Sequence, residues 1–597
     1  MGYSEVQHRE GHVRQDWVVP GQSGHLSRRG FLSLASAAVG GAILAACGGG
    51  GVAPTATAAA PQGTATRIPT AAPAGVGATS PPAAASGVAP TTASRASMVA
   101  SVAPTTQAAA AGKPGGTKVL RIGVPGDLTQ LDPALLNNQT DYQISEAIFN
   151  YIGRHAYNPP LGTDIIPELA DWEISSDAKT FTFHLKKGVM FHGGNGELTT
   201  ADIKAAWDHI KDPNTASPYR NDFIDATVEV DDPYTIKASF PRSYPGFIPA
   251  SLAFRPGFVV ASKAFAAAGD KWKTNPIGSG PFMFDNYQSG TSLTVKRNPN
   301  YWGTKPKVDQ IVWKFRVDDR AAILAVAKGE LDEYYIADPD VAISVAKNTD
   351  PNTRFFKSQF GQSPWSATFN LNHKPLDDIR VRQALRYAID NNAIAKDLFG
   401  GLADPIHSFL PPFMFGYSDD ITHFEYNPDK ARQLLKDANV PKDWNPSAMT
   451  VSALIISRRI LEAVASYWKD VGVNFKVDII EQGIYNQRSL SGDYDVNANY
   501  VSRIDPDQLA TSSFRSTTNR NGYKGADDLI DSARSEPDPA KRAKLYRDLQ
   551  DKISQDSPAA FVVAVSEHLI VNKRVVGELG AGWQERHDWF NLDVPAE

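Results

Sequence analysis

Cysteine is almost absent from the sequence, which has one such residue among 597. A single cysteine excludes an internal disulfide framework and any metal site built from several thiolates. An excess of one charge is lacking too: the formal net charge is −5 and the isoelectric point is near 6.2, which gives no electrostatic reason to expect a nucleic-acid partner. Single cores stop growing near ~250–300 residues, so we expect more than one compact unit.

Motifs with a defined catalytic or phosphate-binding geometry are also lacking. The body of the chain contains no G-x-S-x-G, H-E-x-x-H, G-x-x-x-x-G-K-[ST] or G-x-G-x-x-G. Its carboxylates are numerous but unpatterned, so none predicts a glycosidase pair. The histidines are scattered, which predicts no metal site; they include His184, His192, His373, His407, His423, His568 and His587. These absences favour a binding protein over an enzyme.

The single cysteine ends an apolar run, SRRGFLSLASAAVGGAILAAC (27–47), in which no charge follows Arg29. A run of about 17 residues forms a helix of roughly 25 Å, shorter than the ~30 Å hydrocarbon layer, so an export signal is favoured over a membrane span. Arg28 and Arg29 resemble a twin-arginine export signal. The residues LAAC before and at Cys47 resemble a bacterial lipobox, which implies cleavage before Cys47 and lipid on its sulfur. The alternative is a signal cut elsewhere, with Cys47 incidental.

A segment of low complexity follows the cysteine. Residues 48–117 are nearly all Ala, Pro, Thr, Ser and Gly, with no aromatic or acidic residue. Such a composition cannot bury enough apolar surface to offset the entropy lost on ordering, so we expect a disordered linker. A flexible chain of this length reaches roughly 45 Å. It would tether a folded body that begins near Lys118.

The body alternates between strand and helix patterns. Period-two or continuous apolar runs predict strands at 119–124, 179–185, 292–296 and 560–565. Apolar residues at helical spacing predict helices at 200–210, 378–390 and 427–438. Thr199 and Asp202 read as a capping box, and Pro428 follows the expected cap Asn427. The mixture predicts an α/β fold with antiparallel pieces.

Several blocks, taken in order, resemble one family. They are PELA (167–170), TFTFHLKKGVMFHGGNGELTTADI (180–203), PIGSGPF (276–282), RNPNYWG (297–303), KGELD (328–332), PLDDIRVRQALRYAID (375–390) and YNPDKARQLL (426–435). Together they resemble the large extracytoplasmic solute-binding proteins of the peptide/nickel-binding family 5, or cluster C, of ABC importers. Gly278 and Gly280 are expected to permit unusual backbone angles where the chain crosses between domains.

The resemblance covers essentially residues 118–597 and implies a bilobal, flytrap-like α/β fold with an extra third domain. Lobe I would comprise 118–150, 265–355 and 561–597, the extra domain II would comprise 151–264, and lobe II would comprise 356–560. In such a fold the lobes close on a ligand about a hinge, and the loaded form is presented to a membrane permease.

The chain is therefore expected to be a monomeric, lipid-anchored extracytoplasmic binding component of an ABC importer. Its partners would be a peptide or similarly sized organic solute, the permease and ATPase subunits, and the membrane through lipid on Cys47. No catalytic residue, cofactor or metal is expected. The alternatives are a nonpeptide ligand such as an oligosaccharide, an opine-like conjugate or a metal chelate, an exported hydrolase, and a ligand receptor.

The family resemblance places the ligand loop at YDVNANYVSRIDPD (494–507). Peptide-binding members commonly carry an Asp four residues before the proline of an acidic-Pro pair, where it pairs with the α-amine of the ligand. Ser502 occupies that position here, so the usual amine anchor is expected to be missing, and Asp495, Asp505 and Asp507 are candidate substitutes. Arg503 in the cleft would favour a carboxylate, phosphate or other anion; the alternative is a surface or lobe-closing salt bridge.

Further candidate ligand contacts are aromatic or amide side chains. Tyr142 follows the turn at 131–133, Trp365 and Asn370 flank or lie in an expected strand at 367–371, and Tyr500 lies in the ligand loop. Rigid rings offer apolar contact at low entropic cost and suit variable side chains or sugar faces. A plain core role is the alternative for each aromatic residue.

Overall fold

The structure, a computed structural model, describes residues 115–597 except 137, 156–164, 349, 359–362, 453, 501–502 and 578–586. All of these belong to one compact unit, Val102–Glu597. The export signal with Arg28 and Arg29, the lipid site Cys47 and nearly all of the linker lie outside the described residues. Within the described part of the chain, no helix has the length and apolar character needed to span a bilayer.

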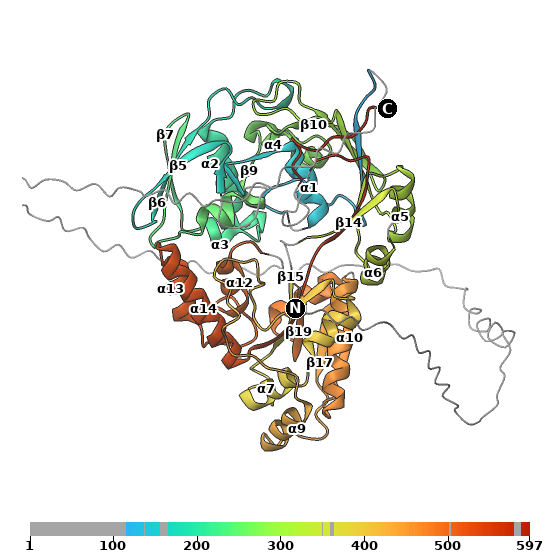
Figure 1. The fold of residues 1–597 in the computed structure, drawn as a ribbon. Coiled ribbons are helices and arrows are strands. Elements are labelled where there is room, and N and C mark those ends of the chain that lie inside the picture. Colours follow the sequence, from blue (N-terminus) through green and yellow to red (C-terminus); the bar gives the residue numbers. More distant parts are fainter. Residues whose placement is uncertain are drawn as a thin grey trace, which may run out of the picture. The chain divides into compact units, whose positions relative to one another are not determined.

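A seven-stranded sheet has the strand order β10-β11-β12-β1-β13-β21-β14 (Figure 1). Its strands are β10 (Phe282–Gln288), β11 (Ser292–Arg297), β12 (Gln310–Lys314), β1 (Val119–Gly123), β13 (Glu333–Tyr335), β21 (His568–Asn572) and β14 (Thr353–Lys357). β1 is parallel to β12 and β13, and the other neighbours are antiparallel. Leu120 and Trp313 are fully buried on this sheet. The helices that pack around it are α1 (Gln139–Ile148), α5 (Asp319–Lys328) and α6 (Pro339–Lys347).

A six-stranded sheet has the order β16-β20-β15-β19-β17-β18 (Figure 1). Its strands are β16 (Ala403–Pro405), β20 (Ala559–Val565), β15 (Ser363–Phe369), β19 (Val496–Tyr500), β17 (Ser447–Val451) and β18 (Lys476–Ile480). The associated helices are α7 (Ile379–Tyr387), α8 (Asn391–Ala393), η6 (Ile394–Leu398), α9 (Pro428–Asp437), α10 (Ile455–Asp470), α11 (Gln482–Ser491), α12 (Pro506–Phe514), α13 (Asp527–Ser535) and α14 (Pro539–Asp556).

All seven residues of β20 are buried, because its alternate side chains face two different cores of the six-stranded sheet. β20 pairs with β15 and β16 in that sheet. Residues 561–565 therefore lie with the second sheet, whereas the sequence analysis grouped the whole of 561–597 with lobe I. The chain crosses to the first sheet only after Val565.

A four-stranded antiparallel sheet, β5-β6-β8-β7, is built from the segment between β1 and β10. Its strands are β5 (Ala170–Ile174), β6 (Thr180–Leu185), β8 (Thr235–Ser239) and β7 (Thr227–Asp232). Around it lie α2 (Thr200–Lys211), α3 (Arg220–Phe223), α4 (Ser262–Ala268), the short helices η1 (His192–Gly194), η2 (Pro213–Thr215), η3 (Phe247–Leu252), η4 (Arg255–Gly257) and η5 (Gly269–Thr274), and the short strands β2 (Asn150–Tyr151), β9 (Phe258–Val259), β3 (Gly153–His155) and β4 (Ile165–Pro167). One continuous core joins this sheet to the seven-stranded sheet.

The strong local patterns of the sequence are confirmed as structure. The predicted strands appear as β1, β6, β11 and β20, and the predicted helices as α2, α7 and α9. Thr199 and Asp202 form the capping box of α2, and Asn427 caps α9 with Pro428 at its first position. The α/β class with antiparallel pieces is likewise confirmed.

Gly278 and Gly280 are required because a side chain at either position would clash with the end of α1. Neither has a positive φ, so the expectation of unusual backbone angles is wrong. A Cβ at Gly278 would lie 2.1 Å from the carbonyl oxygen of Ile148, and one at Gly280 would lie 2.5 Å from the carbonyl carbon of that residue. The two glycines therefore let the backbone pass directly against the end of α1.

His192 ties the four-stranded sheet region to this crossing. Its backbone N–H donates to the carbonyl of Gly278 over 2.8 Å, and its Nε2 lies 3.0 Å from the carbonyl oxygen of Gly280. Burial lowers the pKa of His192 to about 4. The neutral ring is therefore the form that the fold accommodates.

We expect this histidine to make the protein sensitive to acid. The pKa of His192 is lower in the folded than in the unfolded chain. Its contribution to the free energy of unfolding is therefore fully present above pH 6.5 and is lost as the pH falls toward 4. The loss between pH 7 and pH 5 should be about 2 kcal/mol for one such group. Urea unfolding of wild type and His192→Gln at both pH values checks this: the variant should show a smaller difference, and an unchanged difference would contradict the assignment.

Candidate functional site

Among the described strands, the chain crosses between the two large sheets twice. One crossing joins β14 to β15 and the other joins β20 to β21 (Figure 1). The crossings lie side by side, since the backbone N–H of Ser358 donates to the carbonyl of Glu567 over 2.9 Å. Paired short connections between rigid bodies allow rotation by changes at a few backbone dihedrals. The arrangement can therefore act as a hinge.

Ion pairs connect the two sheet regions beside these crossings. Lys357 Nζ lies 3.2 Å from Asp404 Oδ1. Arg459 of α10 reaches Asp340 of α6 over 2.8 Å and Asp338 over 3.5 Å. All of these side chains are partly exposed, so each pair contributes little to stability by itself and can separate at low cost.

A second junction joins the small-sheet region to the α12–α14 segment. The side-chain amide of Gln508 donates to the carbonyl of Ala250 over 3.0 Å. The guanidinium of Arg534 lies 4.6 Å from the ring centroid of Tyr244. A cavity of about 670 Å³ opens here and is lined from both sides, by residues that include Asp222, Arg242 and Tyr244 as well as Arg515, Asp531 and Arg534. A space of this size suits a small organic molecule.

Asp505, predicted as a ligand contact, forms a buried ion pair at this junction. Its Oδ1 accepts from Arg542 Nη2 over 2.7 Å, and the side chains are only 5% and 8% exposed. The same oxygen caps α12 by accepting from the backbone N–H of Asp507 over 2.9 Å. Although burial alone would lower the pKa of Arg542, the Asp505 carboxylate raises it above its usual range. Both charges therefore have structural partners.

Arg503 also belongs to this junction, where it is half-buried. Burial lowers the pKa of its guanidinium, with Tyr219 and Asp222 opposing this and the like charge of Arg255 adding to it. Burial raises the pKa of Asp222 to about 6, with Arg534 opposing and Asp507 adding to the shift. The raised pKa makes the Asp222 carboxylate a stronger base than an ordinary aspartate, and its charge acts on Arg503 together with the charge of Arg255.

Tyr142 joins the same group of side chains through Arg255, whose guanidinium lies 5.3 Å from the Tyr142 ring centroid. The Tyr142 hydroxyl accepts a hydrogen bond from Tyr151 over 2.8 Å, and the ring is fully buried beside Phe254 and Phe258. The structure thus brings Tyr142, Arg503 and Asp505 to one junction between segments distant in sequence.

Trp365 and Tyr500 lie in the six-stranded sheet, and Asn370 directly follows β15. Trp365 is fully buried and donates from Nε1 to Ser457 Oγ over 3.0 Å. It lies opposite Tyr500 in the β15–β19 ladder, and burial raises the pKa of Tyr500 above its usual range, a hydrogen bond with Ser363 opposing. The amide of Asn370 donates to the carbonyls of Gly492 and Tyr494, each over 2.9 Å. Ser502, the expected amine-anchor position, lies outside the described residues.

The candidate substitutes for an amine anchor have local partners. Asp495 accepts from the backbone N–H of Ser447 over 2.8 Å and lies 2.9 Å from Nδ1 of His373. Asp507 is buried, and Arg534 lies 3.7 Å away. These contacts fix both carboxylates to their own lobe.

A chain of three polar side chains resembles part of a hydrolase triad. His209 has Asp132 Oδ2 at 2.9 Å on Nε2 and Thr215 Oγ1 at 3.1 Å on Nδ1. The Asp132 hydrogen bond raises the pKa of His209, which favours the protonated ring. Both contacts hold the end of α2 in place, against the segment after β1 and against η2, which gives this group a structural role.

Sequence reasoning missed Arg255, Tyr219 and Asp222, whose charges act on Arg503, and Arg534, which acts on Asp222. They come from three separate segments, and none stands in a motif that marks it as functional. It also missed the proximity of His407 and His423, treated as scattered, whose rings stack with centroids 4.2 Å apart. The only local signal was the H-x-E spacing of His423 and Glu425, which is weak by itself.

We expect Asp505→Asn to destabilise the protein without any ligand, because Asn keeps the cap but leaves Arg542 as a buried unpaired charge. Breaking a buried pair of this kind costs about 3–5 kcal/mol. The matched control is Asp531→Asn, since the Arg515–Asp531 pair spans 2.9 Å with side chains 28% and 37% exposed; it should cost under about 1 kcal/mol. The midpoints of urea unfolding compare the two, and equal losses would contradict the structural role of Asp505.

The sequence profile of the bacterial extracellular solute-binding proteins, family 5, matches residues 164–522. The dipeptide-binding protein of Escherichia coli is 30% identical over 486 residues, which cover 75% of this chain and 89% of that protein. The heme-binding protein A of Haemophilus influenzae is 28% identical over 467 residues, covering 71% and 83% respectively. The binding protein AgaA from A. tumefacien R10, solved with agropinic acid, has a TM-score of 0.70 at 26% identity and covers 80% of this chain and 99% of that one. The chain belongs to the bacterial extracellular solute-binding proteins of family 5.

Proposed function

We propose that the protein is the solute-binding component of an ABC importer, which captures a peptide or similarly sized organic solute by hinge closure and delivers it unchanged to the permease. The observation that carries the proposal is the pair of crossings held together by Ser358 and Glu567 between two separately packed sheets. A rigid-body rotation about these crossings changes the separation of the surfaces on either side. A ligand that contacts both surfaces selects the closed state.

The charges at the second junction support a ligand with an anionic group. The charge of Arg255 acts on Arg503, and an anion that binds near these two guanidinium groups would be attracted by both. Asp222 opposes this positive charge, and because burial raises its pKa to about 6, the opposition weakens in mildly acidic medium. A free carboxylate matches the fork of a guanidinium through two parallel hydrogen bonds. The terminal carboxylate of a peptide supplies such a group.

A nonpeptide ligand is the second candidate, and the relatives supply the reason. The E. coli relative is a dipeptide-binding protein, whereas another relative is a heme-binding protein and a third was solved with agropinic acid. A carboxylate is also compatible with an opine-like conjugate, so Arg503 by itself does not separate the two candidates. The amine of the ligand separates the two candidates. Because Ser502 stands at the usual anchor position, a free α-amine should add little to the affinity.

The N-terminal sequence supports attachment to the outer face of the cell membrane. The run that ends in LAAC supplies a cleavage site and a sulfur for lipid at Cys47, and the twin arginines Arg28 and Arg29 supply the export address. The linker at 48–117 would give the folded body a reach of roughly 45 Å from the bilayer, enough to find a permease in the same membrane. We propose that the binding protein acts as a monomer.

The proposal predicts which part of a ligand Arg503 recognises. In calorimetric titrations, the dipeptide Ala-Leu should bind wild-type protein at least about tenfold more tightly than its C-terminal amide, because a charge-assisted hydrogen bond contributes about 1.5–3 kcal/mol. Arg503→Gln should remove that preference. N-acetyl-Ala-Leu should bind about as well as the free peptide. Arg432→Gln, which changes a partly exposed arginine paired with Asp429 on α9, is the matched control and should behave as wild type.

Three outcomes would count against the proposal. A strong preference for the free amine would show that another group replaces the missing anchor. Failure of Ala-Leu to bind, together with a retained nonpeptide mass in native mass spectrometry of protein purified without denaturation, would favour the second candidate. Detectable conversion of the bound molecule would overturn the binding function itself.

A further inference from the structure

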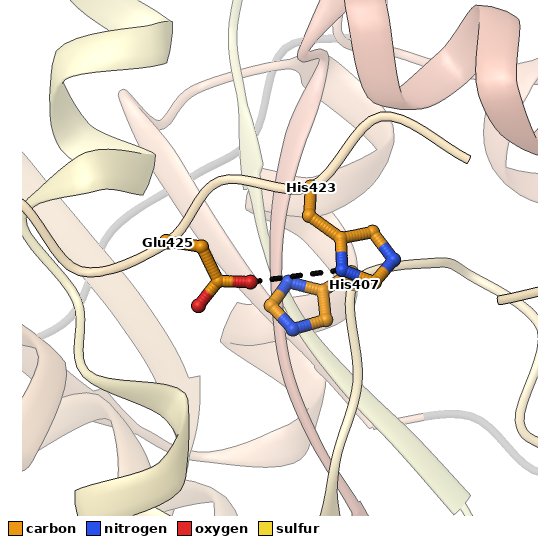
Figure 2. Close-up of side chains that lie close together, drawn as sticks. All are labelled: His407, His423 and Glu425. Atoms are coloured by element: carbon orange, nitrogen blue, oxygen red, sulfur yellow. Dashed lines mark ion pairs between the residues drawn. The ribbon is translucent and has the colours of Figure 1, made fainter. Parts of the chain in front are cut away.

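Three potential metal ligands come together in the six-stranded sheet region. His407 follows β16, and His423 and Glu425 lie in the segment before α9. The two imidazole rings stack with their planes 11° apart, and the Glu425 carboxylate points toward them (Figure 2). His423 Nδ1 lies 3.7 Å from Glu425 Oε1. One ligand atom from each of the three residues lies within 4.8 Å of the others.

A hydrogen bond fixes which ring nitrogen of His423 carries the hydrogen and which one faces the Glu425 carboxylate. His423 Nε2 lies 2.9 Å from the carbonyl oxygen of Asp419, so Nε2 carries the hydrogen. In the neutral ring, Nδ1 is then an acceptor directed at Glu425, which is also an acceptor. A proton on Nδ1 joins the two groups as an ion pair, whereas next to the neutral ring a metal ion can lie between the two lone pairs. Metal-binding histidines almost always donate their second ring N–H to a carbonyl or carboxylate, as His423 does.

The backbone that carries the ligands is held by a buried arginine. Arg386 of α7 donates to the carbonyl of His407 over 3.3 Å and to the carbonyl of Ser554 over 2.5 Å. Its guanidinium also stacks on Phe424, between the two other ligands in sequence, at 3.9 Å from the ring centroid. Arg386 thus orders both ligand segments from beneath.

We propose that His407, His423 and Glu425 form a binding site for a divalent transition-metal ion of the Zn²⁺ class. Two imidazoles and one carboxylate are ligands typical of Zn²⁺, and three protein ligands leave a position for water. Metal–nitrogen bonds are about 2.0–2.1 Å long, so the stacked rings must turn apart and the exposed Glu425 side chain must swing inward. Hard cations such as Mg²⁺ prefer all-oxygen ligands and are expected to bind poorly.

Metal binding would close the segment 408–422 into a loop. Phe413 and Phe415 in that segment pack against the core that contains α12–α14, and Phe415 lies under the guanidinium of Arg542, 5.3 Å from its ring centroid. A metal at the base of the loop therefore orders a segment that supports the Asp505–Arg542 pair. We infer a structural role, in which the ion stabilises this lobe.

The test uses tag-free full-length protein in a Cys47→Ser background, which removes the single thiol. After treatment with a chelator, the protein is titrated with ZnCl₂ and with MgCl₂ by calorimetry, and its thermal midpoint is measured. Wild type should bind one Zn²⁺ and gain thermal stability, whereas Mg²⁺ should do neither. His423→Gln and Glu425→Gln should each weaken Zn²⁺ binding at least about tenfold.

The matched control is His184→Gln, which removes an exposed histidine 3.9 Å from Glu173 on the small sheet. It should bind Zn²⁺ as wild type does. Glu425 is exposed, so Glu425→Gln is expected to fold normally even if a histidine variant does not. The absence of stoichiometric Zn²⁺ binding by wild type, or undiminished binding by folded Glu425→Gln, would overturn the proposal.

Discussion

The backbone hydrogen bond between Ser358 and Glu567 binds together the two strands of chain that pass between the large sheets. Because these crossings run side by side, the sheets can rotate about one local axis without stretching either connection. Each sheet keeps its own buried core, with Trp313 in one and Trp365 in the other. A body of this kind concentrates motion at few residues and leaves the packed interiors unchanged.

The charged side chains differ in how they contribute to closure and to stability. The Asp505–Arg542 pair is buried and capped, so it belongs to the framework of α12–α14. The Arg459–Asp340 and Lys357–Asp404 pairs are partly exposed and span the sheets, where water can replace each partner cheaply. Arg503 lies between these extremes: it is half-buried, burial lowers the pKa of its guanidinium, and the like charge of Arg255 adds to this shift.

Local sequence patterns were sufficient to predict helices and strands but not the candidate functional site. Alternation at 180–185 and the capping box at Thr199 depend on nearby residues, so β6 and the start of α2 could be predicted. The need for Gly278 and Gly280 was recognised, but its cause, contact with Ile148, involves a helix end more than a hundred residues away in sequence. The same distance problem hid the group around Arg503 and the stacking of His407 on His423. Contacts between remote segments leave no periodicity in a single sequence.

The most direct test of the account measures closure. With Cys47→Ser removing the native thiol, spin labels at Leu324→Cys on α5 and Leu490→Cys on α11 use two exposed positions, 63% and 67% accessible, one on each large-sheet region. The distribution of distances between the labels is measured with and without the solute identified by native mass spectrometry. On binding, the mean distance should shift and the distribution should become narrower. A same-lobe pair at Ile455→Cys and Leu490→Cys should not change. An unchanged distance in the first pair, with binding shown by calorimetry, would contradict capture by hinge closure.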